Sequence, residues 1–98
     1  EIENVLMEHP RIAEVTVVGI PDEKWGEVIG CFFRTENNEL VSVRTLHNFC
    51  RNRLSPQKTP TIWCRVDEFP MTGSRKIQKF VIRDRFLKGA YQPLTLGH

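Results

Sequence analysis

The sequence predicts an α+β fold: a small, mainly antiparallel or mixed three-stranded sheet with helices packed on it. Two observations lead to this class. Apolar residues follow a strand pattern in three stretches and recur at helical spacing in three others. The resulting order is helix, strand, strand, helix, strand, helix, which suits a sheet covered by helices. The 98 residues are enough for one domain with a single core, and they contain no internal repeat.

The first half of the chain predicts a helix and then a pair of strands. The helix is indicated by apolar residues at helical spacing, namely Ile2, Val5 and Leu6. Pro10 closes this helix. Residues 13–20 alternate as a strand does, Pro21-Asp22 turns the chain, and a second strand is expected over 28–34.

The second half predicts a helix, a strand and a last helix. Ser42 is placed to cap the first of these helices. Its apolar stripe is Val43, Leu46, Phe49, Cys50 and Leu54. A linker over 56–60 leads to a strand over 61–66, and a loop over 69–76 precedes the last helix, which ends at Gly89. That helix is marked by Ile77, Phe80, Val81 and Leu87.

Charge is distributed unevenly along a chain of ordinary globular composition, which is 40% hydrophobic and 27% charged. Residues 1–43 hold three Lys or Arg against nine Asp or Glu, a net charge of −6. Residues 44–88 hold eleven against three, a net charge of +8, which together give the total of +2. One half of the domain therefore carries a positive field suited to phosphates, whether on a nucleotide, a nucleic acid or an acidic partner.

The cysteines predict neither disulfides nor a metal site. Cys31, Cys50 and Cys64 are odd in number, lack CxxC spacing and stand within apolar patterns. We expect them to be small buried hydrophobic residues in a reducing compartment. The three histidines share no ligand spacing, and no apolar run reaches the roughly twenty residues of a membrane span.

The loop from Pro70 to Lys76 is the strongest candidate for chemistry. Gly73 and Ser74 make its backbone flexible and polar, and Arg75 and Lys76 place two cations near the start of a helix. A lysine on a long stem suits a phosphate, and a helix N-terminus adds backbone N–H groups. A solvated basic turn is the alternative interpretation. No P-loop, GxSxG motif or Cys–His pair accompanies the loop, so the chain alone does not predict a complete enzyme.

Four stretches together resemble the C-terminal domain of AMP-forming acyl-CoA synthetases, in the adenylate-forming ligase superfamily. They occur in the order and spacing of that family. They are Glu1-Ile2-Glu3 followed by His9-Pro10, VTVVGIPD over 15–22 with Trp25-Gly26-Glu27, LSPQKTP over 54–60, and VDEFPMTGSRKIQK over 66–79. The last stretch is similar to the family motif that contains "SGK", and Lys76 stands at its lysine.

The resemblance implies a specific role for this domain. In the family, an N-terminal domain binds ATP, Mg²⁺ and a carboxylic acid, and the small C-terminal domain moves between two poses. In the first pose the loop lysine, here Lys76, supports formation of the acyl-adenylate. In the second pose another face of the domain serves the attack of CoA that forms the thioester. The implied partners are therefore the N-terminal domain, the acid, ATP and CoA, with neither nucleic acid nor a membrane span.

The resemblance also implies candidate residues for binding CoA or nucleotide. Arg51 stands where some members place an arginine near the CoA nucleotide, and Trp25 and Gly26 border the expected path of pantetheine. Arg75 occupies the position where the family usually has glycine, and this arginine adds bulk and charge next to Lys76. Gln57 replaces a common tyrosine.

The expected organisation is a mobile C-terminal domain over residues 1–88 and a tail over 89–98. We expect a piece of a longer cytoplasmic protein, inactive by itself because the ATP and acid sites belong to the other domain. Three alternatives are kept. They are the adenylation-domain lid of a peptide synthetase or a luciferase-like relative, a small basic phosphate- or nucleic-acid-binding module, and a catalytically silent relative.

Overall fold

The computed structural model describes residues 2–38, 41–55, 58–71, 73 and 76–94. It confirms the predicted α+β class and order, with one short 3-10 helix added. The elements are α1 (Ile2–Met7), β1 (Ile12–Asp22), β2 (Gly26–Thr35), η1 (Glu36–Asn38), α2 (Val43–Arg51), β3 (Ile62–Arg65) and α3 (Lys79–Leu87). Among the described residues, no helix is long and apolar enough to cross a membrane.

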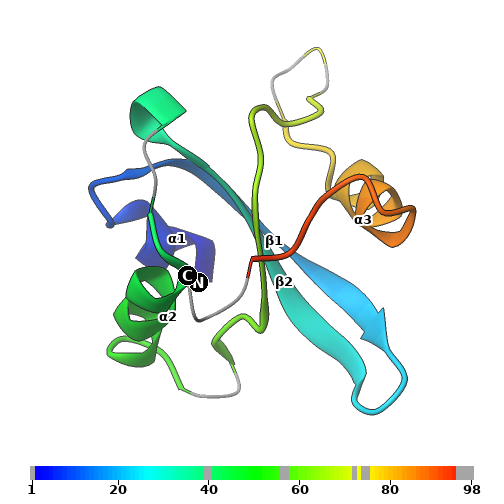
Figure 1. Cartoon of the computed structure of the whole chain (residues 1–98), viewed down its shortest axis with the longest axis horizontal. Helices are drawn as coiled ribbons and strands as arrows, with labels where there is room; N and C mark the ends of the chain where they lie inside the picture. Colours follow the sequence, from blue (N-terminus) through cyan, green and yellow to red (C-terminus); the bar gives the residue numbers. More distant parts are fainter. Residues whose placement is uncertain (1, 39–40, 56–57, 72, 74–75, 95–98) are drawn as a thin grey trace.

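The sheet is mixed, with strand order β1-β2-β3 (Figure 1). β1 and β2 form an antiparallel hairpin whose ladder runs on to Asp22 and Gly26. Gly26 has φ 81°, a left-handed conformation that glycine adopts without steric cost. The hairpin is thus longer than predicted, because Pro21-Asp22 continues the strand. β3 lies parallel to β2, with Trp63 opposite Cys31.

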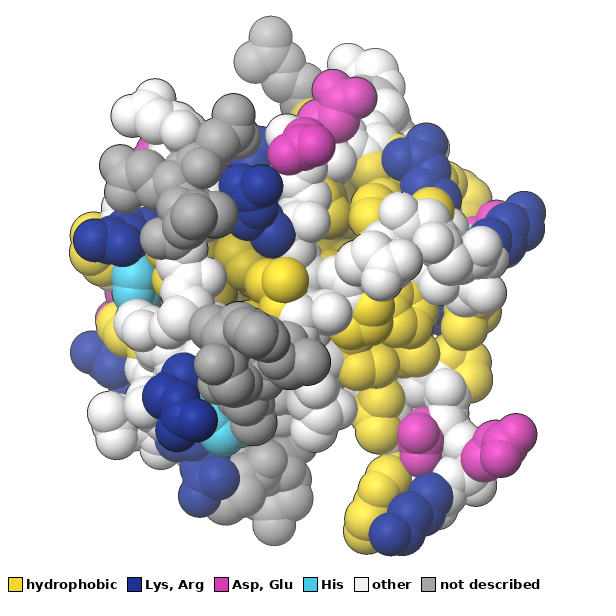
Figure 2. Space-filling model, in the orientation of Figure 1, with side chains coloured by type: hydrophobic (Ala, Val, Ile, Leu, Met, Phe, Trp, Pro, Cys, Tyr) yellow, Lys and Arg dark blue, Asp and Glu magenta, His cyan; other side chains and the backbone are white. Residues whose placement is uncertain are grey.

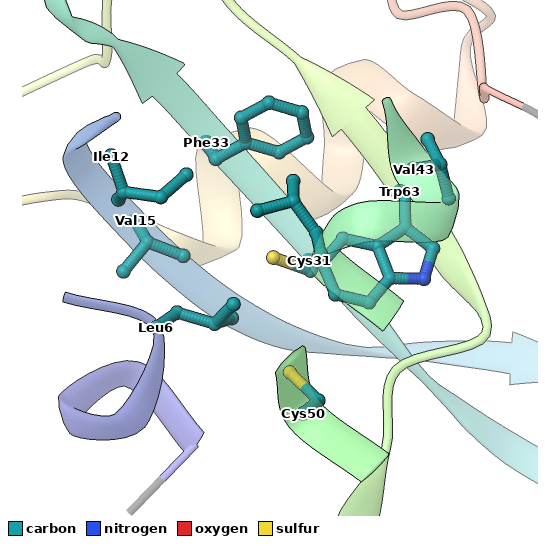
Figure 3. Close-up of a cluster of buried hydrophobic side chains, with 9 residues drawn as sticks. Leu6, Ile12, Val15, Cys31, Phe33, Val43, Cys50 and Trp63 are labelled. Carbon is teal, nitrogen blue, oxygen red and sulfur yellow. The ribbon is translucent and has the colours of Figure 1, made fainter. Parts of the chain in front are cut away.

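Helices cover both faces of this sheet, α1 and α2 on one and α3 on the other (Figure 1). Alternate residues of each strand divide between two clusters because side chains alternate across a strand. The α1/α2 cluster contains Leu6, Ile12, Val15, Cys31, Phe33, Val43, Leu46, Cys50 and Trp63 (Figure 3). The α3 cluster contains Val18, Ile20, Phe32, Cys64, Val66, Phe69 and Ile82.

The helix α2 forms as its sequence predicts. The Ser42 hydroxyl accepts a hydrogen bond from the Thr45 amide at 3.1 Å, which satisfies one of the amides at the helix start. Val43, Leu46 and Cys50 are buried against the sheet. The helix ends at Arg51, earlier than the predicted stripe.

All three cysteines are free and buried, as predicted. Burial raises the pKa of Cys50 and of Cys64 to about 11, and it raises the pKa of Cys31 further above its usual value. Thiols held in this protonated state behave as small hydrophobic side chains. Within the described part of the chain, no group of histidines, cysteines and acidic residues could hold a metal ion.

The last helix, α3, differs from the other two in how it is buried. It begins at Lys79, two residues later than the predicted apolar series. Ile82 is fully buried, and Phe86 packs edge-on against Phe32 at 5.8 Å between ring centroids. By contrast Phe80 and Leu87 are 69% and 55% exposed. The helix is held by its buried side, and two of the apolar residues that predicted it face outward.

Candidate functional site

The loop that carries Lys76 is closed at its base by backbone contacts. The amide of Gln78 donates to the carbonyl of Pro70 at 2.9 Å, and Met71 pairs with Ile77 as an isolated bridge. Lys76 is exposed and stands one residue inside that bridge. Arg75 lies outside the described residues. The lysine therefore projects from a loop whose base is fixed, and α3 begins three residues later.

Both arms of this loop also reach into the α3 cluster. Phe69, just before the loop, is buried, and Ile77 packs against the same group of side chains. Fixed arms limit the positions from which the Lys76 side chain can extend. This is the geometry that a positioned cation needs, because a charge held in place stabilises a reacting group without reorganising first.

A further contact ties the start of α3 to the sheet. Glu3 Oε2 lies 3.0 Å from Lys79 Nζ and accepts hydrogen bonds from the Val17 amide at 2.7 Å and the Thr16 hydroxyl at 3.1 Å. Partial burial pushes the pKa of Glu3 upward, but the Val17 hydrogen bond and the Lys79 ammonium outweigh it and lower the pKa. This contact was not predicted from the sequence. Its only signal was a glutamate within the family-like opening of the chain.

The hairpin turn between β1 and β2 forms the second candidate region. Trp25 is 71% exposed, and Lys24 Nζ lies 5.1 Å from the centroid of its ring. The carboxylate of Asp22 accepts hydrogen bonds from the amides of Lys24 and Trp25 at 3.0 and 2.8 Å. Figure 2 shows hydrophobic, basic and acidic side chains together at this turn, in the lower right of the view. The indole is available to a ligand and is not a core residue of this domain.

An open hollow of about 740 Å³ lies beside this turn. It extends from the hairpin to the segment that leads into β3, and its lining is mostly apolar with two carboxylates. The lining residues are Asp22, Trp25, Glu27, Val28, Ile29, Thr59, Thr61 and Ile62. A long, weakly polar ligand suits a wall of this kind.

The predicted residue Arg51 lies in the last turn of α2, exposed to solvent. α2 contains no acidic residue, and Arg44 is exposed on the same helix. Figure 2 shows Lys and Arg side chains over the region of α2, in the lower left. Arg53, just after the helix, stacks on the Phe49 ring at 3.7 Å. This helix supplies the basic surface that the charge distribution predicts.

The Lys76 loop and the Trp25 turn lie at opposite ends of the sheet (Figure 1). The register explains why: Asp22 pairs with Gly26 at the turn, whereas β3 runs parallel to β2 and leaves the sheet with Arg65 opposite Phe33. Seven residues of strand separate Gly26 from Phe33, about 23 Å at 3.3 Å per residue. The structure therefore does not bring the predicted site residues together into one site.

Comparisons with known proteins identify the family of the chain. Residues 1–76 match the family model of the AMP-binding enzyme C-terminal domain, which ends at Lys76. The chain belongs to this family. The match takes in the elements from α1 to β3 and stops in the loop before α3.

Three relatives show how far the similarity extends. The chain is 43% identical over 86 residues to a fatty acid–[acyl-carrier-protein] ligase, ScoC, of Streptomyces coeruleorubidus, covering 88% of this chain and 17% of that protein. It is 36% identical over 85 residues to the human mitochondrial medium-chain acyl-CoA ligase ACSF2, covering 87% and 14%. A solved Mycobacterium tuberculosis fatty acyl CoA synthetase superposes with a TM-score of 0.84 at 35% identity, covering 91% and 18%. The chain thus spans less than a fifth of the length of these relatives.

Proposed function

We propose that this chain is the mobile C-terminal domain of an AMP-forming acid–thiol ligase. In this proposal Lys76 serves the adenylation step and the Trp25 end of the domain serves the thiol step. The observation that supports the proposal is the placement of the two regions at opposite ends of the sheet, in which β2 alone spans about 23 Å between Gly26 and Phe33. Two groups so far apart cannot act on one small reacting centre in a single pose, so the domain must rotate between the steps.

In the adenylation step, an oxygen of the substrate carboxylate attacks the α-phosphorus of ATP. The bond from that phosphorus to the bridging oxygen of pyrophosphate breaks, and acyl-AMP and pyrophosphate result. Lys76 is exposed at the end of its loop, so its ammonium can be presented to the N-terminal domain. There it stabilises negative charge on the carboxylate and the α-phosphate, without transferring a proton. Mg²⁺ is held mainly by the N-terminal domain in this scheme.

In the thiol step, the sulfur attacks the acyl carbon of the adenylate, the thiol proton is lost and AMP leaves with the oxygen. The exposed Trp25 ring and the hollow beside it form one wall for the pantetheine arm, and Gly26 adds no side chain next to that ring. Arg51 attracts the CoA phosphates in this proposal, whereas Arg75, next to Lys76 in the sequence, adds a second cation at the adenylation end. CoA is the proposed acceptor. The thiol of a carrier protein is the second candidate, because the relative ScoC is named as an acyl-carrier-protein ligase.

The decisive experiment changes Lys76→Ala in the full-length ligase and follows the two half-reactions separately. We expect acid-dependent exchange between ATP and pyrophosphate to fall at least about a hundredfold, as for removal of one preorganised charge-stabilising group. Thioester formation from a supplied acyl-adenylate should persist, because that step uses the other end of the domain. Lys88→Ala, an exposed lysine near the far end of α3, is the matched control. Unchanged exchange in Lys76→Ala, or no exchange in the unaltered ligase, would refute the proposal and favour a silent relative.

A further inference from the structure

We propose that Glu3 is a positioning residue for Lys76 and acts through Lys79. The inference rests on the proposed function and adds a residue to the adenylation machinery. Glu3 is near the beginning of the chain, whereas the lysine that it would position is more than seventy residues away. Their connection exists only in the folded domain, through the ion pair at the first residue of α3.

The backbone that follows Lys76 is held at three successive points. Ile77 pairs with Met71, the amide of Gln78 donates to Pro70, and the side chain of Lys79 meets Glu3. Three residues span at most about 10 Å, so a shift at Lys79 is transmitted to Lys76 with little slack. The first two contacts hold the loop's arms to each other. Of these three contacts, only the third connects the segment after Lys76 to α1, and through Glu3 to β1.

The carboxylate of Glu3 is itself immobilised by the sheet. Its Oε2 accepts the amide of Val17 at 2.7 Å and the buried hydroxyl of Thr16 at 3.1 Å. β1 is an edge strand, so Val17 turns an otherwise unpaired amide toward this oxygen. Thr16 and Val17 are paired on their other side with Phe32 and Cys31 of β2. A negative charge fixed in this way gives Lys79 a well-defined place to bind.

The exposure of the pair indicates that its role is placement more than stability. The Glu3 and Lys79 side chains are 36% and 53% exposed, and ion pairs at that exposure are screened by solvent and contribute little to folding. In catalysis, small displacements of a charged group reduce the rate far more than they reduce stability. Lys88 and Asp84 also lie 3.0 Å apart, but they are four residues apart on α3 and connect it to no other element. That pair is a matched control.

The test uses Lys79→Met and Glu3→Gln in the full-length ligase, with the same two half-reactions. Glu3→Gln keeps an oxygen for the Val17 amide and removes the charge that binds Lys79. We expect each change to lower the adenylation exchange rate about three- to tenfold and to leave thioester formation from supplied adenylate within about twofold. Lys79→Arg should restore most of the exchange, since its guanidinium still reaches a carboxylate. Lys88→Met should leave both half-reactions unchanged.

The double variant decides whether the two residues act through each other. If they do, Glu3→Gln with Lys79→Met lowers exchange no further than the stronger single change. Effects that multiply, or an equal fall in both half-reactions together with a lower melting temperature, would overturn the inference in favour of independent or merely structural roles. Unchanged exchange in both single variants, while Lys76→Ala abolishes it, would overturn this inference alone. Failure of the proposed function is different: there Lys76→Ala itself leaves exchange intact.

Discussion

At one end of the sheet, both arms of the Lys76 loop reach into the core and the helix that follows is tied to Glu3. At the other end, the hairpin turn projects with Trp25 71% exposed, and the Asp22 carboxylate accepts the amides of Lys24 and Trp25. A single cation must be held in register with a reacting phosphate, whereas a flexible thiol arm needs only an apolar wall. The difference in anchoring follows the difference in the proposed chemistry. Four predictions test it, from the largest expected effect to the smallest.

The largest effect is expected for stability at the anchored end. Replacing Phe69, which is buried in the α3 cluster, by Ala should lower the free energy of unfolding of the 98-residue chain by about 3 kcal/mol. Trp25→Ala removes a larger side chain from the exposed hairpin turn, yet it should change the free energy of unfolding by no more than about 0.5 kcal/mol. Urea denaturation of the two variants measures both values. Comparable losses would show that the two ends are equally anchored.

A second prediction separates the ends by activity. Trp25→Ala in the full-length ligase should slow thioester formation from supplied adenylate about tenfold, the equivalent of losing 1.4 kcal/mol of apolar contact. The exchange of ATP with pyrophosphate should not change, because Trp25 lies at the far end of the sheet from Lys76. Trp25→Phe, which keeps an aromatic face, should recover most of the rate. A fall in exchange would break the assignment of one step to each end.

The sequence predicted the elements and most of the core, because those depend on local spacing. A hydroxyl just before a helix caps that helix in most folds, as Ser42 caps α2. Thiols within apolar patterns are buried in most folds, as the three cysteines are here. The ion pair between Glu3 and Lys79 could not be predicted, because the two side chains meet only when α1 and α3 have both packed against β1. Nor did spacing show that Phe80 would be exposed, since apolar residues occur around much of α3 and only packing selects the buried side.

The third prediction concerns the turn itself. Asp22→Ala removes the acceptor of two backbone hydrogen bonds, at 3.0 Å from the Lys24 amide and 2.8 Å from the Trp25 amide. The free energy of unfolding should fall by about 1 kcal/mol, and the two amides should exchange with deuterium faster. Asp22→Asn retains a side-chain oxygen and should behave nearly as the unaltered chain. If the two amides exchanged with deuterium as slowly in Asp22→Ala as in the unaltered chain, the strand ladder alone would shape the turn.

The smallest effect is the pH dependence that Glu3 gives to folding. Its pKa in the folded chain is below the usual 4.5, so the unfolded chain takes up the proton first as the pH falls. The stabilisation from Glu3 is therefore fully present above about pH 4.5 and is lost as the pH falls through the lower, folded value. Because the side chain is partly exposed, the contribution should be under about 1 kcal/mol.

Comparing the unaltered chain with Glu3→Gln measures this contribution directly. Glu3→Gln should be less stable at about pH 7, and the gap should close once the pH is below the folded pKa of Glu3, where the glutamate is neutral like the glutamine that replaces it. Lys79→Met should lose only part of the effect, because the Val17 amide still binds the carboxylate at 2.7 Å. Urea midpoints of both chains, at neutral pH and at a pH low enough to protonate Glu3 in the folded chain, measure this difference in stability. If the gap were the same at both, the shape of Glu3 rather than its charge would hold α3 to the sheet, and the anchored end would depend on packing alone.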